Sequence, residues 1–170
     1  MKRFIVANIF VLVLVSMGFA GEPDIEKHRS CTYCGMDREK FAQSRMLIDY
    51  DDGTSVGVCS LHCAAVELAN SIDKSPRSIG VGDFRSRKLI DAEKAFWVVG
   101  GSKPGVMTGN AKWAFESKAD AEKMIQESGG RLASFEEAIK AAYEDMYTDT
   151  KRIRERRTMK RSVGPQGHAH

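Results

Sequence analysis

Two thiols and a thioether lie within six positions of the segment RSCTYCGMDREK, residues 29–40. Cys31 and Cys34 form a C-x-x-C motif, and Met36 follows Cys34 after a single glycine. Cysteines with this spacing can close a small disulfide, exchange thiols, hold a structural zinc ion or carry a soft ion such as copper(I). A c-type haem is excluded, because Gly35 stands where the attachment motif needs histidine.

A second pair of cysteines, Cys59 and Cys63, lies at the predicted start of a helix. We call the turn that carries Cys31 and Cys34 the knuckle. The knuckle, a predicted hairpin over 45–58 and the start of the helix follow one another in the order of a treble-clef metal site. The positive end of the helix favours thiolate over thiol. Four thiolates at one point repel one another, so either a cation neutralises them or they pair as disulfides. Four interpretations stay open: structural zinc, disulfides, thiol exchange, and a copper(I) carrier in which Met36 adds a thioether.

The hydrophobic pattern predicts an α+β fold that begins with a ββαβ unit. Strands over 45–50 and 54–58 flank the turn signal DDG. A helix follows Ser60 and carries apolar residues at helical spacing up to Ile72, and residues 78–84 return as a strand.

The second half of the chain repeats this order, which predicts a tandem duplication of the unit. Strands are expected over 95–101 and 112–117, followed by a helix that the glycine pair GG ends and by a strand over 131–135. A last helix begins at Ser134, where Glu137 completes a capping box.

The two ends of the chain differ in composition from its middle. Two basic residues, an apolar run over 4–15 and small residues up to Ala20 form the pattern of a cleavable secretory signal peptide. The context lacks a lipid-attachment cysteine, so we expect export to the periplasm without a lipid anchor. From Thr148 onward no apolar stripe continues, which predicts a frayed helix passing into disorder.

The predicted organisation therefore has four parts: a signal peptide over 1–20, a first ββαβ unit with the cysteine site over 21–86, a second unit with the final helix over 87–147, and a basic disordered tail over 148–170. Residues 21–150 hold 17 basic and 22 acidic residues, a balance that argues against nucleic-acid binding. The basic tail could contact anionic lipid weakly, or an acidic partner.

The motif CTYCGM, followed by FWVVGGSKPGVMTGNAKWAFESKADAEKMIQESGGRLASFEEA, resembles the NosL family of nitrous-oxide-reductase accessory proteins over about residues 28–146. The resemblance implies a duplicated ββαβ fold and a periplasmic copper(I) chaperone for cuproenzyme maturation. Cys34 and Met36 match the family's cysteine-glycine-methionine motif, and Met107 matches the methionine of its second-half loop. The second cysteine pair falls outside that motif, so a zinc-like four-thiol site can replace or accompany the copper site.

Because no serine-histidine-aspartate grouping, P-loop or pair of carboxylates emerges from the sequence, we predict a protein that is not an enzyme. The expected partner is a recipient cuproenzyme or a copper-transfer protein. A zinc-stabilised interaction module and a periplasmic thiol-redox protein are the alternative functions. The candidate metal ligands share a sulfur donor: Cys31, Cys34, Met36, Cys59, Cys63 and Met107.

Other residues that could bind metal have structural explanations. His62, between the second pair of cysteines, is expected to face sideways from the helix, exposed or behind the ligands. Met46, Met124 and Met146 occupy core positions of a strand or helix, and we expect them to pack rather than bind. Trp97 and Trp113 are expected in the core.

Overall fold

A computed structural model describes residues 22–162, and the expected signal peptide lies outside these residues. The first half forms a four-stranded antiparallel sheet with the strand order β2-β1-β3-β4. Its elements are the short helix α1 (Pro23–Lys27), β1 (Met46–Tyr50), β2 (Ser55–Val58), α2 (Leu61–Asn70), β3 (Pro76–Gly82) and β4 (Leu89–Asp91). The β1–β2 hairpin turns at the predicted DDG, where Gly53 has a φ of 81°.

The second half forms a three-stranded antiparallel sheet with the strand order β6-β5-β7. Its elements are β5 (Phe96–Val99), β6 (Lys112–Phe115), α3 (Lys118–Ser128) and β7 (Arg131–Ala133). In both halves the first strand is central, the second and third strands flank it, and the helix lies between the second and third in sequence.

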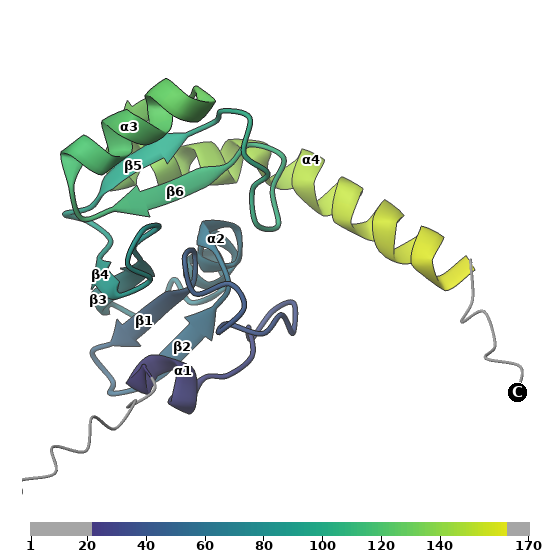
Figure 1. Ribbon diagram of the computed structural model, residues 1–170. Coiled ribbons are helices and arrows are strands. Elements are labelled where there is room, and N and C mark those ends of the chain that lie inside the picture. The colour runs from purple at the N-terminus through teal and green to yellow at the C-terminus, as the bar shows by residue number, and fades with distance from the viewer. Residues whose placement is uncertain (1–21, 163–170) are drawn as a thin grey trace, which may run out of the picture.

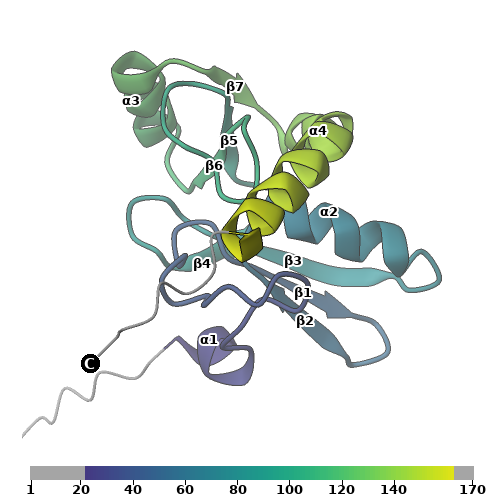
Figure 2. The same ribbon diagram turned by 90° about the vertical axis from the view of Figure 1, so that its right-hand side faces the viewer.

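Helix α2 and the first part of the long C-terminal helix α4 (Phe135–Ser162) lie between the two sheets, and the rest of α4 projects beyond them, as Figures 1 and 2 show. Helix α2 packs on β1 and β2, α4 packs on β5 and β7, and the two helices contact each other. Helix α3 covers the other face of the second sheet (Figure 1). Within residues 22–162, no helix combines the length and the apolar character that crossing a bilayer would require.

Alternation along β5 divides the core into two clusters. Trp97 and Val99 face the larger cluster, which contains three of the four cysteines and residues of both halves. Val98 faces the smaller cluster under α3, together with Trp113 and Met124. The core positions predicted for both tryptophans and for Met124 are therefore confirmed.

Two predictions about the first half need correction. Helix α2 ends at Asn70, and Ile72 lies beyond it with 86% of its surface exposed. The boundary expected after residue 86 falls within the connection from β3 to β4, because residues 89–91 pair with β3. One cluster of buried residues joins the two halves, so the packing crosses the expected boundary.

Helix α4 begins at the predicted capping box and continues further than predicted. The backbone N–H of Ser134 donates to Glu137 Oε2 at 2.8 Å, and the N–H of Glu137 donates to Ser134 Oγ at 3.2 Å. The disorder predicted for the tail is wrong for residues 148–162, the part that the structure describes, because α4 runs to Ser162. Lys, Arg and Glu are strong helix formers, and Asp149 is buried against the body, so the helix needs no full apolar stripe to continue.

Candidate metal centre

The four cysteine sulfurs meet at one point, as the treble-clef order predicted. All four lie within 4.8 Å of one another. Cys34 Sγ is 3.4 Å from Cys59 Sγ, which is 3.8 Å from Cys63 Sγ. Cys31, Cys59 and Cys63 are buried, whereas Cys34 is partly exposed. The cluster thus has three buried cysteines and one that is partly exposed.

The first two cysteines are placed by a tight knuckle of the backbone. The N–H of Cys31 donates to the carbonyl of Met36 at 2.8 Å, and the N–H of Gly35 donates to the carbonyl of Cys31 at 2.9 Å. Gly35 has a φ of 75°, which an L side chain rarely adopts. This conformation explains the glycine between Cys34 and Met36, because it turns the chain back after the second thiol.

Tyr33, at the tip of the knuckle, is tied to helix α2. Its hydroxyl donates to Glu67 Oε2 at 2.6 Å, and the hydroxyl of Tyr50 donates to Oε1 of the same carboxylate at 2.7 Å. Burial raises the pKa of Glu67, but the hydrogen bonds from Tyr33 and Tyr50 outweigh it, so the pKa lies below its usual range. The buried carboxylate therefore stays ionised and connects the knuckle, the first sheet and the helix that carries Cys63.

A buried ionic network next to the knuckle was not indicated by any pattern in the sequence. The Arg38 side chain is fully buried and donates to Asp24 Oδ2 at 2.7 Å. It also donates to the backbone carbonyls of four residues: Asp24, His28, Met46 and Val58. Arg45, equally buried, donates to both oxygens of Asp24 at 2.9 and 3.0 Å. Arg38 therefore fastens the segment carrying Cys31 and Cys34 to the hairpin that leads to Cys59.

The electrostatics of the cluster favour a cation. The hydrogen bond from Cys34, with those from Cys59 and Cys63, holds the pKa of Cys31 far below its usual range. The contact with Cys31 raises the pKa of Cys34, but Cys59 and Cys63 lower it to about 7. The pKa values of Cys59 and Cys63 are raised, first by Cys31 and also by burial. Some of the thiols ionise easily, but complete ionisation needs a neutralising ion.

The sulfur positions fit a metal better than a disulfide. A disulfide bond is about 2.05 Å long, whereas the two sulfur separations above are 3.4 and 3.8 Å, and all four cysteines are free. Zinc–sulfur bonds of about 2.3 Å would place the sulfurs of a regular tetrahedron about 3.8 Å apart. The arrangement can therefore hold one soft or borderline metal ion on four sulfurs.

The structure places both candidate thioethers close to the cluster. Met107 lies in the β5–β6 loop with a φ of 61°, and it lines a hollow with Cys34 and Cys63. We call this hollow the mouth; it is lined by Tyr33, Cys34, His62, Cys63, Val66, Met107, Thr150, Ile153, Arg154 and Arg157. Met36 and Met107 also line a second, adjoining groove. The loop of the second half thus reaches the knuckle of the first, although no contact fixes either thioether as a ligand.

His62 is buried, with 5% of its surface accessible, so the exposed one of its two expected placements is excluded. Its Nδ1 lies 3.7 Å from Oδ2 of Asp149 on α4, and Asp149 is 3% exposed. Burial lowers the pKa of His62 in spite of this carboxylate, which favours the neutral imidazole. The other oxygen of Asp149 accepts the backbone N–H of Gly109 at 2.9 Å. Asp149 thereby joins α4 to the Met107 loop and approaches the helix that carries Cys63.

No signal in the sequence separated Asp149 from the surrounding polar residues of the tail. Its role depends on α4 passing beside α2, which is a long-range contact. The same holds for Asp24, which stands in a short N-terminal helix and pairs with arginines 14 and 21 positions away.

Comparisons with known proteins agree with this arrangement. The NosL family model matches residues 22–143, which include all six candidate ligands. A similar solved structure is that of the copper chaperone NosL from Shewanella denitrificans, with 25% identity and a TM-score of 0.55; the match covers 69% of this chain and 94% of that one. Among curated proteins, no sequence matches. Since the family model spans most of the chain, this protein belongs to the NosL family.

Proposed function

We propose that this protein is a copper(I) chaperone, which carries the ion on its cysteine cluster and delivers it to a recipient protein. The observation that carries the proposal is the meeting of four cysteine sulfurs within 4.8 Å of one another, with one of the cysteines partly exposed. Thiolate and thioether donors favour copper(I) among biological metal ions. Membership of the NosL family and the similarity to a solved copper chaperone support the same cargo.

The mouth supports delivery rather than permanent storage. Cys34 is partly exposed and shares the mouth with Met107, so an incoming donor can approach the ion from this side. A thioether is a weaker ligand than a thiolate and can be displaced first. We infer that Cys34 and Met107 hold the ion at the mouth before transfer, with Met36 nearby and Cys31, Cys59 and Cys63 supplying the inner thiols. The incoming donor then replaces Met107 first.

The wider setting follows from the sequence. The N-terminal pattern supports export to the periplasm, and the NosL resemblance supports a recipient cuproenzyme of the nitrous-oxide-reductase type or a protein that transfers copper to it. We infer a carrier and not an enzyme, because the cluster is explained by holding an ion. The shared strand order β2-β1-β3 and β6-β5-β7 supports a tandem duplication, with one unit in each half of the chain.

Structural zinc is the second candidate for the cluster. The separation of 3.8 Å between the sulfurs of Cys59 and Cys63 is that of a zinc tetrahedron, and three of the four thiols are buried. A closed site of this kind would stabilise the first half and would release its ion slowly. The two functions differ in their preferred metal and in the role of Met107.

Replacing Met107 with leucine should weaken copper(I) binding by about tenfold, because the change removes a sulfur donor from the mouth. Leucine has a similar volume, so stability should change by less than about 1.5 kcal/mol. Competition with a coloured copper(I) chelator under anaerobic, reducing conditions measures the affinity, and thermal unfolding measures the stability.

Met124→Leu is the matched control, because Met124 is a buried residue of α3 in the smaller core cluster, which contains no cysteine. This variant should bind copper(I) as the wild type does. Equal copper(I) affinities for the Met107 variant and the wild type would show that the ion belongs to the cysteines alone.

A further inference from the structure

A wide groove runs between the C-terminal part of α4 and the body of the protein. Its volume is about 570 Å³, and it adjoins the mouth at Met107, Ile153 and Arg157, which line both. Its walls come from the knuckle segment, the β5–β6 loop and α4. We call it the α4 groove; it is lined by Met36, Phe41, Gln43, Pro104, Gly105, Val106, Met107, Thr108, Trp113, Asp149, Arg152, Ile153, Arg156, Arg157 and Lys160.

One wall of the α4 groove is strongly basic. Arg152, Arg156, Arg157 and Lys160 line it from successive turns of α4. Arg152 lies 3.9 Å from the carboxylate of Asp149. Within residues 22–162, the other three cations take part in no ion pair, and all three are exposed. Their charge is therefore available to a partner.

The groove is also lined by apolar side chains, which we call its floor, and two of them are candidate copper ligands. Met36 and Met107 line it beside Phe41, Val106 and Trp113. A partner that occupied the groove would bury this apolar surface and would bring its own donor atoms next to the two thioethers. The groove thus offers a partner positive charge, apolar contact and access to the two thioethers.

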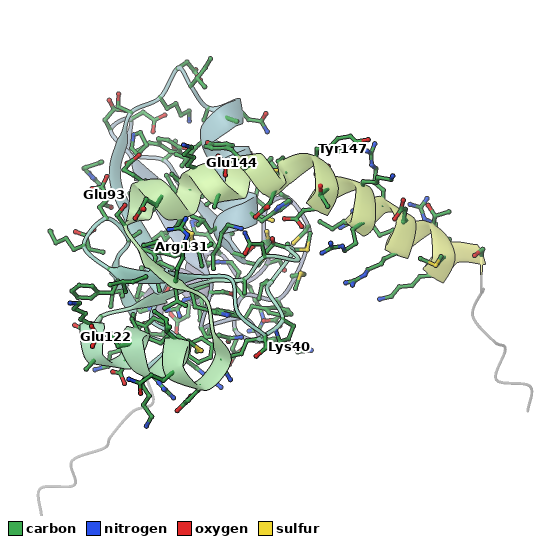
Figure 3. All side chains as sticks on the ribbon, turned by 90° about the horizontal axis from the view of Figure 1, so that it is seen from above. Lys40, Glu93, Glu122, Arg131, Glu144 and Tyr147 are labelled. Atoms are coloured by element: carbon green, nitrogen blue, oxygen red, sulfur yellow. The ribbon has the colours of Figure 1, made fainter. Side chains whose placement is uncertain are left out.

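The basic part of α4 has no evident role within the fold. Figure 3 shows the helix passing Glu144 and Tyr147 and then leaving the rest of the molecule, as Figure 1 also shows from the side. The region that the family model matches ends at residue 143. The cations of the groove consequently stand on an extension of the chain beyond that region.

We propose that the α4 groove docks an acidic segment of the copper-receiving protein and guides it to Met36 and Met107. This inference rests on the proposed copper(I) delivery. Guanidinium groups bind carboxylates through paired hydrogen bonds, and three unpaired cations along one wall match a segment with several Asp or Glu residues. Apolar side chains of the segment, methionine included, fit the floor.

The shape of the site favours a polypeptide over a membrane surface. The basic groups and the apolar side chains line the same groove, where an extended or helical segment can contact both. A flat bilayer would meet the outer cations of α4 equally well and would leave the floor uncovered. If α4 binds a membrane, the loss of any basic residue of the helix should weaken binding equally. If the groove docks a polypeptide, the loss of the basic residues that line the groove should weaken binding most.

The experiment compares two double variants of the full mature chain that remove equal charge. The groove variant is R156Q and K160Q, which leaves Arg157 in place because it also lines the mouth. The control variant is K151Q and R161Q, whose lysine and arginine also lie on α4, are exposed and line neither the groove nor the mouth. The probe is a short fluorescein-labelled peptide rich in Asp and Glu with leucine and methionine, and the comparison peptide has lysine in place of each acid.

Fluorescence anisotropy should show that the acidic peptide binds the wild type and that the lysine peptide does not. The groove variant should lose about tenfold in affinity, and the control variant less than about threefold. Equal losses in both variants, or no binding of the acidic peptide to the wild type, would overturn the proposal. Binding to phosphatidylglycerol vesicles with equal losses, in the absence of peptide binding, would assign α4 to a membrane surface instead.

A copper(I) titration of the same proteins separates this proposal from the proposed function. The groove variant should keep the copper(I) affinity of the wild type, because neither of its two changes lies at a sulfur ligand or lines the mouth. If the wild type failed to bind copper(I), the delivery function would fall while the peptide data still decided whether the groove docks an acidic segment.

Discussion

Replacing Cys34 with serine is expected to lower the affinity for copper(I) by about a hundredfold or more, because the change removes a thiolate from the ion. Cys34 is the cysteine that reaches the surface, and its sulfur lies 3.4 Å from that of Cys59. The apo protein should keep its thermal midpoint, since a partly exposed thiol contributes little to packing. Chelator competition under reducing conditions measures the affinity.

Thr32→Ser is the matched control for this change. Thr32 lies in the same knuckle, and its hydroxyl donates to the carbonyl of Gly57 at 3.2 Å, a bond that serine can keep. Copper(I) binding should be unaffected in this variant. If the Cys34 variant bound copper(I) as tightly as the Thr32 variant, the exposed sulfur would have no part in holding the cargo.

Replacing Arg38 with alanine should destabilise the protein by about 3–5 kcal/mol, the cost of breaking a buried ion pair. The change removes a fully buried guanidinium and leaves four backbone carbonyls and one oxygen of Asp24 without this donor. Urea unfolding of the metal-free protein measures the loss. Because Arg38 fastens the knuckle to the hairpin, copper(I) affinity should fall as well.

Arg29→Ala is the control for charge at a neighbouring position. Arg29 pairs with Glu39 at 3.3 Å, but its side chain is 72% exposed. Its removal should cost less than about 1 kcal/mol. Similar losses in the two variants would mean that the buried network does not hold the knuckle.

The network also predicts how stability depends on pH. Burial raises the pKa of Asp24, but hydrogen bonds and charge from Arg45 and Arg38 outweigh it and hold the pKa below its ordinary value of 3.8. A carboxyl with a lowered pKa contributes its full stabilisation above the unfolded value and loses it as the pH falls through the folded value. Acid unfolding linked to Asp24 should thus occur below pH 3.8 in the wild type and begin at a higher pH in the Arg38 variant.

Local patterns accounted for much of the fold. The DDG turn, the alternation along β5 and the reciprocal bonds of Ser134 and Glu137 each depend on residues a few positions apart. The two cysteine pairs could be brought together because the order of knuckle, hairpin and helix is itself a local arrangement. Ser60 stands at the predicted N-cap of α2, although its side chain makes no capping hydrogen bond.

Features that depend on distant contacts were missed. The edge strand β4 has three residues, and its pairing with β3 shows no alternation that a sequence window could detect. The burial of Asp24, Arg38 and Asp149 requires partners far along the chain, and charged residues are seldom expected inside. Helix α4 continues because its residues have high helix propensity. The prediction of disorder gave more weight to the missing apolar stripe than to this propensity.

The two thioethers show how far the resemblance to NosL extends. Met36 and Met107 are 71 positions apart, and periodicity gives no reason to pair them. The resemblance matched both methionines to family positions, and both line the α4 groove. Their binding to the metal stays a prediction, and the leucine variant of Met107 tests it.

Metal competition tests the central claim most directly. Mature protein is reduced anaerobically, exposed to equal amounts of copper(I) and zinc in the presence of a buffering chelator for each, and analysed for both elements after gel filtration. A copper(I) chaperone should retain about one copper(I) per chain and exclude zinc, because soft sulfur donors prefer the softer ion. One zinc per chain with no copper(I) would contradict the chaperone function and would make the four cysteines a structural zinc site.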